Sequence, residues 1–173
     1  MTLYRALVAL GLGVMSASSV VAIQIPGTRV SYFAAIDTVN RDNRGLIKVF
    51  EVNDTGGQTL MEFVCDLGVM RASFRGKNVL LSESSREVGL FPLVVYQVDE
   101  QQLKSLRTAG LKDGDGQISL QGLAFENNAV VVAAFKNAAS RVRLTVSRLG
   151  MTELTFVFDT RGFQQALTKI KPC

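Results

Sequence analysis

Hydrophobic and polar residues alternate strictly along two stretches in the last third of the chain, 141–148 and 152–159. Alternation with a period of two is typical of β-strands that bury one face. A three-residue turn at 149–151 would place Val146 opposite Leu154 and keep both apolar faces on one side. The pattern therefore predicts an antiparallel hairpin.

Shorter apolar runs between turn-forming residues predict further strands in the first half of the chain. These expected strands cover residues 32–39, 46–52, 59–65, 69–74, 78–82 and 90–98. Polar or glycine-containing turns at 40–45, 54–57 and 67–68 would join the first four into hairpins. Pro92 places the beginning of the last run at a sheet edge or a strand end.

Helical spacing replaces the alternation in three segments. Over 99–110, Asp99 as an N-cap, Leu103 and Leu106 one turn apart and Gly110 as a stop predict a helix. A second helix is expected to begin at Asn127 or Asn128, with apolar residues at helical spacing up to 138. A third is expected from Gly162 to Pro172; its apolar face is formed by Phe163, Ala166, Leu167 and Ile170.

Residues 1–22 have the three parts of a secretory signal peptide. Arg5 precedes an apolar run, serines follow it, and Val20 and Ala22 occupy the positions that signal peptidase requires to be small. The apolar run is too short for a membrane span, which needs about 20 residues. We therefore expect export, cleavage after Ala22, and a single mature domain over 23–173 with no membrane span. Its location would be the periplasm, the cell envelope or the extracellular space.

Export bears on the two cysteines, Cys65 and Cys173. In an oxidising compartment, two isolated cysteines indicate one structural disulfide. A buried free thiol at Cys65, or an intermolecular bridge through Cys173, would be the alternatives. The expected fold is α+β: mostly antiparallel β-sheet or sandwich, with two or three helices including a C-terminal one, and one disulfide.

The chain contains no histidine, which excludes whole classes of chemistry. Histidine bases, Ser-His-Asp triads, Cys-His pairs and histidine metal ligands are all ruled out. Zinc-ligand spacings and phosphate-binding glycine loops are also absent, and no cofactor is indicated. Paired carboxylates could still act as acid and base, so an exported hydrolase of that kind is the alternative to a binding protein.

The stretch 111–119 contains alternating aspartate and glycine, and its sequence is similar to that of a calcium-binding loop. Asp113, Asp115 and Ser119 would occupy ligand positions of an EF-hand. The first ligand position is Leu111, however, and the last, which should be an acid, is Gly122. We therefore interpret the stretch as a turn between a helix and a strand and keep calcium only as a weak candidate.

Basic residues near the C-terminus form a candidate patch for an anionic partner: Arg141, Arg143 and Arg148 on the hairpin, and Lys169 and Lys171 on the last helix. The alternative is a solvated face with cross-strand ion pairs, such as Arg141 with Asp159. Without Arg5 the mature chain has 18 basic and 15 acidic residues, a net charge of +3. That excess is too small to indicate nucleic acid. A protein or an anionic envelope polymer is the expected partner.

The order of motifs in the C-terminal half resembles small exported bacterial domains of the VasI type, which are associated with type VI secretion. The resemblance rests on Tyr96-Gln-Val-Asp99, on the ending Phe158-Asp-Thr-Arg-Gly162-Phe163-Gln-Gln-Ala166-Leu167, and on the closing Cys173. It implies a compact β-rich domain with a docked terminal helix, in which Cys65 matches the closing cysteine. It implies no catalytic residues, and the tryptophan that often follows the first motif is missing here. The expected function is that of a non-enzymatic envelope or extracellular accessory protein that binds another macromolecule.

Overall fold

A computed structural model describes residues 22–36, 43–66, 68–170 and 173 of the chain. These residues form two antiparallel sheets and three helices. In spatial order, the seven strands of the larger sheet are β1 (Ile23–Gln24), β2 (Val30–Ile36), β3 (Asn43–Phe50), β4 (Leu60–Asp66), β5 (Val69–Arg75), β9 (Ile118–Phe125) and β8 (Thr108–Lys112). The predicted α+β class with mostly antiparallel strands is confirmed.

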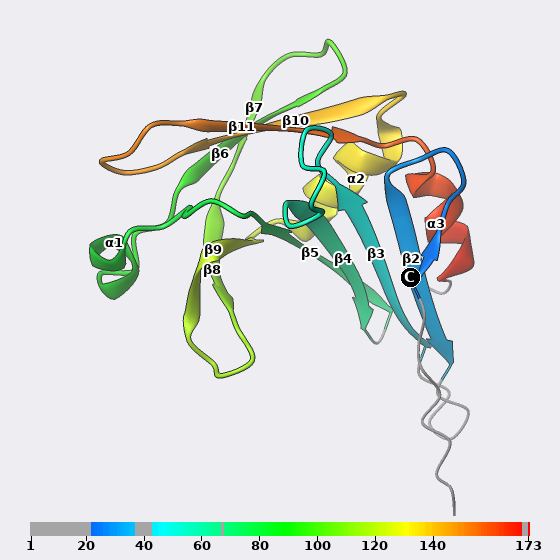
Figure 1. The fold of residues 1–173 in the computed structure, drawn as a ribbon, viewed down its shortest axis with the longest axis horizontal. Helices are drawn as coiled ribbons and strands as arrows, with labels where there is room; N and C mark the ends of the chain where they lie inside the picture. Colours follow the sequence, from blue (N-terminus) through cyan, green and yellow to red (C-terminus); the bar gives the residue numbers. More distant parts are fainter. Residues whose placement is uncertain (1–21, 37–42, 67, 171–172) are drawn as a thin grey trace, which may run out of the picture.

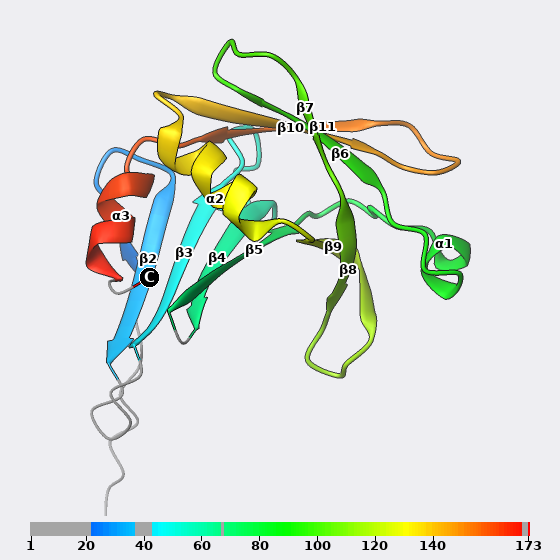
Figure 2. The same cartoon turned by 180° about the vertical axis from the view of Figure 1, so that it is seen from behind.

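The smaller sheet has four strands, in the order β11 (Leu154–Asp159), β10 (Arg141–Ser147), β6 (Leu93–Val98) and β7 (Lys104–Leu106). The helices are α1 (Glu83–Glu87), α2 (Asn128–Asn137) and α3 (Phe163–Lys169). The strands of the smaller sheet run across the upper end of the larger sheet in Figure 1. Helix α1 lies at the opposite side of the molecule from α3 (Figure 1). Helices α2 and α3 pack side by side on one face of the larger sheet (Figure 2).

Phenylalanine rings fill the space between the two sheets and the helices. Phe135 of α2 lies with its ring centroid 4.9 Å from that of Phe63 on β4, 5.7 Å from that of Phe163 on α3 and 5.9 Å from that of Phe158 on β11. All four side chains are at most 1% exposed. This cluster joins both sheets and two helices into one core.

The predicted C-terminal hairpin is confirmed in its register. β10 pairs with β11 so that Val146 lies opposite Leu154 and Arg141 opposite Asp159. The side chains of the second pair do not meet, because Arg141 forms an ion pair with Glu100 and Asp159 with Arg161. The hydrogen bond from the Arg161 side chain outweighs partial burial and lowers the pKa of Asp159.

Helix α2 also begins and packs as predicted. The side chain of Asn127 caps it by accepting a hydrogen bond from the Val130 amide. Val131, Ala134 and Phe135 are buried on one face, as the spacing indicates. Helix α3 likewise follows the predicted segment, and Phe163, Ala166 and Ile170 are buried.

The helix predicted over 99–110 is wrong. This segment instead contains β7 and the beginning of β8, and the two strands join different sheets. Asp99 has a φ of 47°, in the left-handed region, so it turns the chain rather than leading into a helix. Leu103 and Leu106 do not share a buried face either, since Leu103 is 62% exposed and Leu106 only 5% exposed.

The strand predicted over 78–82 is also wrong. The segment is irregular, and the amides of Leu80 and Leu81 both donate to the carbonyl oxygen of Leu120, at 2.8 and 3.2 Å. Both leucines are buried, which explains the apolar run without a strand. The next residues, Glu83–Glu87, form α1 with Ser82 as its N-cap.

The carboxylate of Asp99 ties the end of β6 to the beginning of β10. It accepts hydrogen bonds from the amides of Ala139 at 2.8 Å, Ser140 at 2.9 Å and Arg141 at 3.0 Å, and from the Ser140 hydroxyl at 2.8 Å. The bond from the Arg141 amide is the largest cause that lowers the pKa of Asp99, and with the other bonds it outweighs desolvation and brings that pKa to about 2.

Replacing Asp99 by asparagine is therefore expected to destabilise the domain in a pH-dependent way. A folded pKa below the ordinary value stabilises the protein above pH 4 and loses this effect as the pH falls through about 2. Discounted for solvent screening of a partly exposed group, we expect about 1 kcal/mol at pH 7. Urea unfolding of wild type and Asp99→Asn should show this difference at pH 7 and little of it at pH 2. Glu100→Gln is the matched control, and a difference independent of pH would contradict the assignment.

The disulfide between Cys65 and Cys173 is formed, and it fastens the end of the chain to β4. Gly45, which lies opposite Cys65 on β3, leaves room for Ile170 after α3. A Cβ atom at Gly45 would lie 2.6 Å from Cβ of Ile170. The close contact and the disulfide together hold α3 on the larger sheet.

The predicted signal peptide lies outside the described residues, apart from Ala22. No helix within the described ranges combines the length and apolar character needed to cross a membrane. The disulfide indicates folding in an oxidising compartment.

Candidate functional site: the leucine pocket

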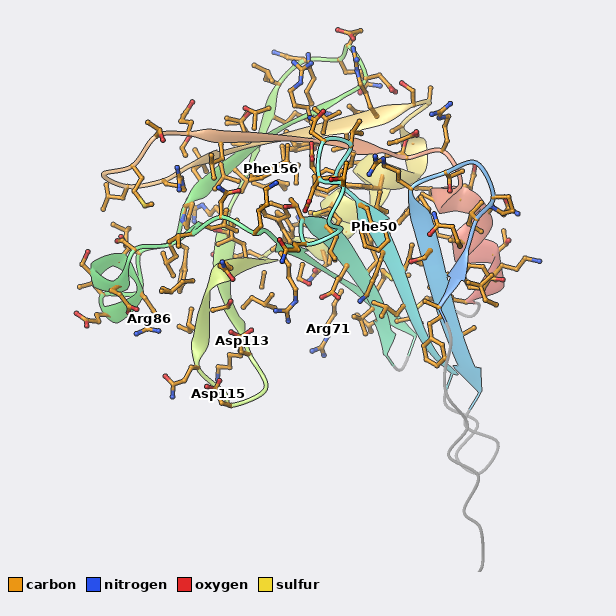
Figure 3. The ribbon with its side chains drawn as sticks, in the orientation of Figure 1. Phe50, Arg71, Arg86, Asp113, Asp115 and Phe156 are labelled. Atoms are coloured by element: carbon orange, nitrogen blue, oxygen red, sulfur yellow. A yellow bond between two sulfur atoms is a disulfide. The ribbon has the colours of Figure 1, made fainter. Side chains whose placement is uncertain are left out.

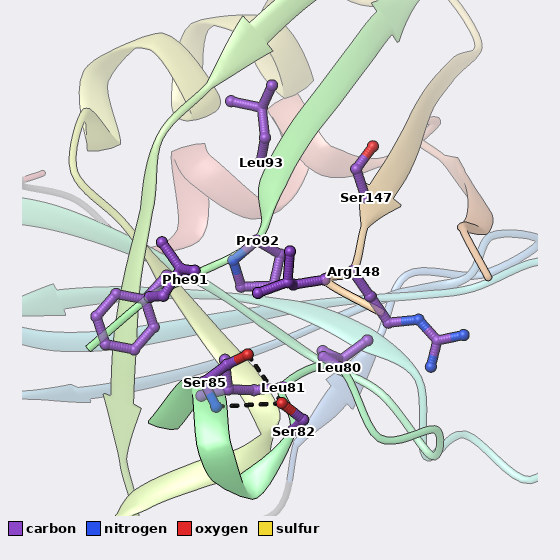
Figure 4. A pocket seen from close by; sticks show the side chains of 11 residues that line it. Leu80, Leu81, Ser82, Ser85, Phe91, Pro92, Leu93, Ser147 and Arg148 are labelled. Atoms are coloured by element: carbon purple, nitrogen blue, oxygen red, sulfur yellow. Dashed lines mark hydrogen bonds between the residues drawn. The ribbon is translucent and has the colours of Figure 1, made fainter. Parts of the chain in front are cut away.

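An apolar cavity of about 290 Å³ lies where α1, the beginning of β6 and the end of β10 meet. We call it the leucine pocket (Figure 4). Its lining consists of Leu80, Leu81, Ser82, Ser85, Leu90, Phe91, Pro92, Leu93, Ser147, Arg148 and Leu149. Leu80 and Leu81 are buried and form part of its wall, whereas Leu90, Leu93 and Leu149 are 49%, 47% and 65% exposed.

Further exposed apolar side chains belong to the segments around this pocket. Val79 precedes the buried leucines, Val88 ends α1, and Met151 lies in the same turn as Leu149. They are 40%, 75% and 37% exposed. A soluble surface rarely gathers large apolar side chains in this way unless it is an interaction site.

Arg148 connects two walls of the pocket through main-chain carbonyl groups. Its Nε donates to the carbonyl oxygen of Thr152 at 2.8 Å, and its Nη1 donates to that of Val79 at 2.6 Å. The guanidinium therefore holds the turn between β10 and β11 against the segment before α1. Leu149, which follows Arg148 in this turn, also lines the pocket.

Two of the three serines that line the pocket, Ser82 and Ser85, are hydrogen-bonded to each other. The Ser82 hydroxyl accepts from the Ser85 amide at 3.1 Å and donates to the Ser85 hydroxyl at 2.8 Å (Figure 4). The pocket lining contains no carboxylate and no lysine to act as a base. The third serine of the lining, Ser147, donates its hydroxyl to Oε1 of Glu153 at 2.5 Å.

The four described residues of the proposed anionic-partner patch, Arg141, Arg143, Arg148 and Lys169, do not gather around one point. Arg141 is paired with Glu100, and Arg143 Nη1 donates to Gln97 Oε1 at 3.3 Å. Arg148 lies at the other end of β10 and faces the pocket. Lys169 ends α3, on the other side of the molecule from the β10–β11 turn (Figure 1), and Lys171 lies outside the described residues.

Two calcium candidates, Asp113 and Asp115, lie in the turn between β8 and β9, and the third, Ser119, lies on β9; the turn joins two strands rather than the predicted helix and strand. Asp113 forms an ion pair with Arg75, with 3.1 Å between Oδ1 and Nη1. Asp115 accepts from the Gln117 amide at 3.0 Å, and Ser119 accepts from the Gln121 amide at 3.3 Å. Across the described parts of the chain, no three acidic or cysteine side chains are grouped as metal ligands would be.

Sequence patterns did not indicate the leucine pocket. Its walls come from 80–93 and 147–149, which are far apart in the chain. Each leucine taken alone has the character of a core residue. The signal for an interaction surface is exposure, and exposure depends on the tertiary structure.

Comparison of the chain with protein-family models, curated proteins and solved structures gave no match.

Proposed function

We propose that this protein is an exported, non-enzymatic accessory protein that binds another protein through the leucine pocket. The observation that carries the proposal is the gathering of six exposed apolar side chains at this end of the molecule: Val79, Val88, Leu90, Leu93, Leu149 and Met151. Burying such side chains against a partner yields about 25 cal/mol per Å² of apolar surface removed from water.

The chemistry of the pocket favours an apolar anchor side chain as its occupant. Five of its eleven lining residues are leucines, and the only charged group in its lining, Arg148, has its Nε and Nη1 bonded to carbonyl oxygens. A cavity of about 290 Å³ can accept one large side chain. Protein interfaces typically place an aromatic or aliphatic anchor in such a pocket.

The alternative of a hydrolase with paired carboxylates receives no comparable support. A carboxylate pair must converge in one cleft, at about 5 to 10 Å. The five cavities considered in the described chain contain a single acidic lining residue, Asp54. Its carboxylate is bound by the amides of Gly56, Gln58 and Thr59, which holds a turn.

The leader, the disulfide and the VasI-type resemblance bear on where the partner is found. We propose that the leader directs export, so the partner belongs to the periplasm, the envelope or the extracellular space. The disulfide supports this location because such bonds persist in oxidising compartments. The VasI-type resemblance stays a prediction, and it suggests an envelope assembly as the setting.

Replacing Leu149 by aspartate is expected to abolish partner binding and leave the fold intact. Leu149 is 65% exposed in a turn, so the charge costs little in the free protein and much in a closed apolar interface. The measurement is recovery of the bound protein from an extracytoplasmic extract by immobilised wild type and variant. We expect recovery to fall at least tenfold, which corresponds to the loss of a hot-spot residue.

Leu103→Asp provides the matched control. Leu103 is similarly exposed, at 62%, and does not line the pocket. A protein retained by wild type and Leu103→Asp but lost from Leu149→Asp supports the proposal. Equal recovery by all three would refute it, and unchanged urea unfolding of Leu149→Asp would show that the variant is folded.

A further inference from the structure

One strand in the middle of the larger sheet, β5, has a neighbouring strand on both sides over only part of its length. β5 pairs with β4 along its whole length, but with β9 only over Ser73–Arg75. The first part of β5, residues 69–71, therefore has no strand beside it on the β9 side within the described structure. β9 ends at Phe125, and α2 begins beside Ala72. The turn of the β8–β9 hairpin points away from β5 (Figure 1).

Main-chain groups at this edge face outwards from β4. The Ala72 amide donates to Oδ1 of Asn128 at 2.7 Å, so it points away from β4. In an antiparallel strand, every second residue directs its amide and carbonyl to the same side. Met70 therefore presents its amide and carbonyl at the open edge, two residues before Ala72.

A groove of about 590 Å³ lies along this edge, and it is larger than the leucine pocket. Its walls are Val64, Cys65, Arg71, Ala72, Ser73, Leu111, Ala124, Phe125 and Asn128. Val64 on β4 and Leu111 on β8 give it apolar sides. Arg71, Ser73 and Asn128 are its polar groups, and the Arg71 side chain points towards the gap between β5 and the β8–β9 hairpin (Figure 3).

The ion pairs described on this face of the sheet involve Arg75 and not Arg71. Four residues after Arg71 on β5, Arg75 Nε lies 2.9 Å from Glu62 and its Nη1 lies 3.1 Å from Asp113. Glu62 also lies 3.5 Å from Lys48, so these four residues neutralise one another. Among the side chains that the structure describes, no carboxylate forms an ion pair with Arg71, which lines the groove.

We propose that the groove binds an extended polypeptide segment that carries an acidic side chain, and that this segment adds as a strand to residues 69–71 of β5. Its main chain would bond to the amide and the carbonyl of Met70, as in β-strand addition at other sheet edges. The residue paired with Arg71 would share its face of the sheet, because paired residues of adjacent strands point to the same side. An aspartate or glutamate at that position supplies the missing carboxylate.

This site is separate from the leucine pocket, and neither depends on the other. The two sites share no lining residue. The protein could thus hold an apolar anchor at one end and an acidic strand at its sheet edge. Leu149→Asp, which disables the leucine pocket, should leave peptide binding at the groove unchanged.

The test uses a capped pentapeptide, Thr-Val-Glu-Val-Thr, titrated into the full mature protein by calorimetry and followed by amide NMR shifts. We expect binding that weakens at least tenfold when glutamine replaces the glutamate, because an ionic hydrogen bond to Arg71 is lost. Methylation of alternate peptide nitrogens on the pairing side should abolish binding, and the Met70 amide should shift on binding of the unmodified peptide.

Arg71→Gln should weaken binding of the glutamate peptide to the level of the glutamine peptide. Arg143→Gln, an exposed arginine on the other sheet, is the matched control and should bind as wild type does. Glutarate, which carries carboxylates without a peptide chain, should not bind. Absence of peptide binding, equal binding of both peptides, or equal binding of glutarate would overturn the proposal, as would pairing of two copies of the protein through this edge.

Discussion

Replacing Cys173 by serine is expected to lower the free energy of unfolding by about 4 to 5 kcal/mol, the largest effect we predict for a single change. The disulfide closes a loop between residues 108 positions apart, and in the chain-entropy treatment a long loop removes much freedom from the unfolded chain. Cys173 is exposed, so serine leaves no buried cavity there. Urea unfolding under non-reducing conditions measures the difference.

Wild-type protein with a reductant provides the control for this variant. The reduced wild type should unfold at the urea concentration of Cys173→Ser, and the reductant should not change the variant further. A thiol assay on denatured, oxidised wild type should find no free thiol. Equal midpoints for oxidised wild type and variant would show that the bond does not stabilise the domain.

Replacing Phe135 by alanine is expected to cost about 3 to 5 kcal/mol, the usual range for a phenylalanine lost from a core. Phe135 is 1% exposed and contacts rings from β4, β11 and α3. The cavity would open at the point where both sheets and two helices meet. Chemical denaturation followed by circular dichroism should show a lower midpoint with a single cooperative transition.

Two further variants show whether this loss is specific to the core. Phe135→Leu keeps most of the volume and should cost less than the alanine variant. Leu103→Ala removes an exposed leucine, and it should change stability by no more than about 0.5 kcal/mol. If Phe135→Ala were no less stable than Leu103→Ala, the proposed core would be wrong.

The elements that could be predicted are those whose neighbours in the fold are also neighbours in the chain. The β10–β11 hairpin was predicted to the register, because Val142, Leu144 and Val146 alternate with polar residues and a short turn fixes the pairing. Helix α2 was predicted because Asn127 caps it and its apolar face follows the helical period. In both cases local pattern and tertiary packing agree.

The segment 99–110 could not be predicted, because distant partners determine its structure. Residues 104–106 pair with β6 and 108–110 pair with β9. Pairing within two sheets therefore outweighs the local preference for a helix that the spacing indicates. Asp99 has the chemistry of a helix cap, but its carboxylate accepts hydrogen bonds from the amides of residues 139–141, some 40 positions away. A residue's capping chemistry does not reveal which amides it will meet.

The binding surfaces were beyond prediction for a related reason. The basic residues were grouped by their closeness in sequence, yet Arg148 is used to brace the leucine pocket and Lys169 lies on α3. Arg71 was not singled out, because its place at the groove depends on where β9 leaves β5. Both candidate sites arise from the divergence or meeting of elements that are remote in the chain.

The most direct test of the proposed function is photo-crosslinking in the living cell at single positions of the exported protein. A photoreactive phenylalanine analogue would replace Leu149 or Leu93, which line the leucine pocket, or the exposed Leu103, which does not. We predict one discrete heavier product, containing the same partner, from both pocket positions and none from position 103. Products of equal yield from all three positions, or no product from either pocket position, would contradict the assignment of the leucine pocket as the partner-binding site.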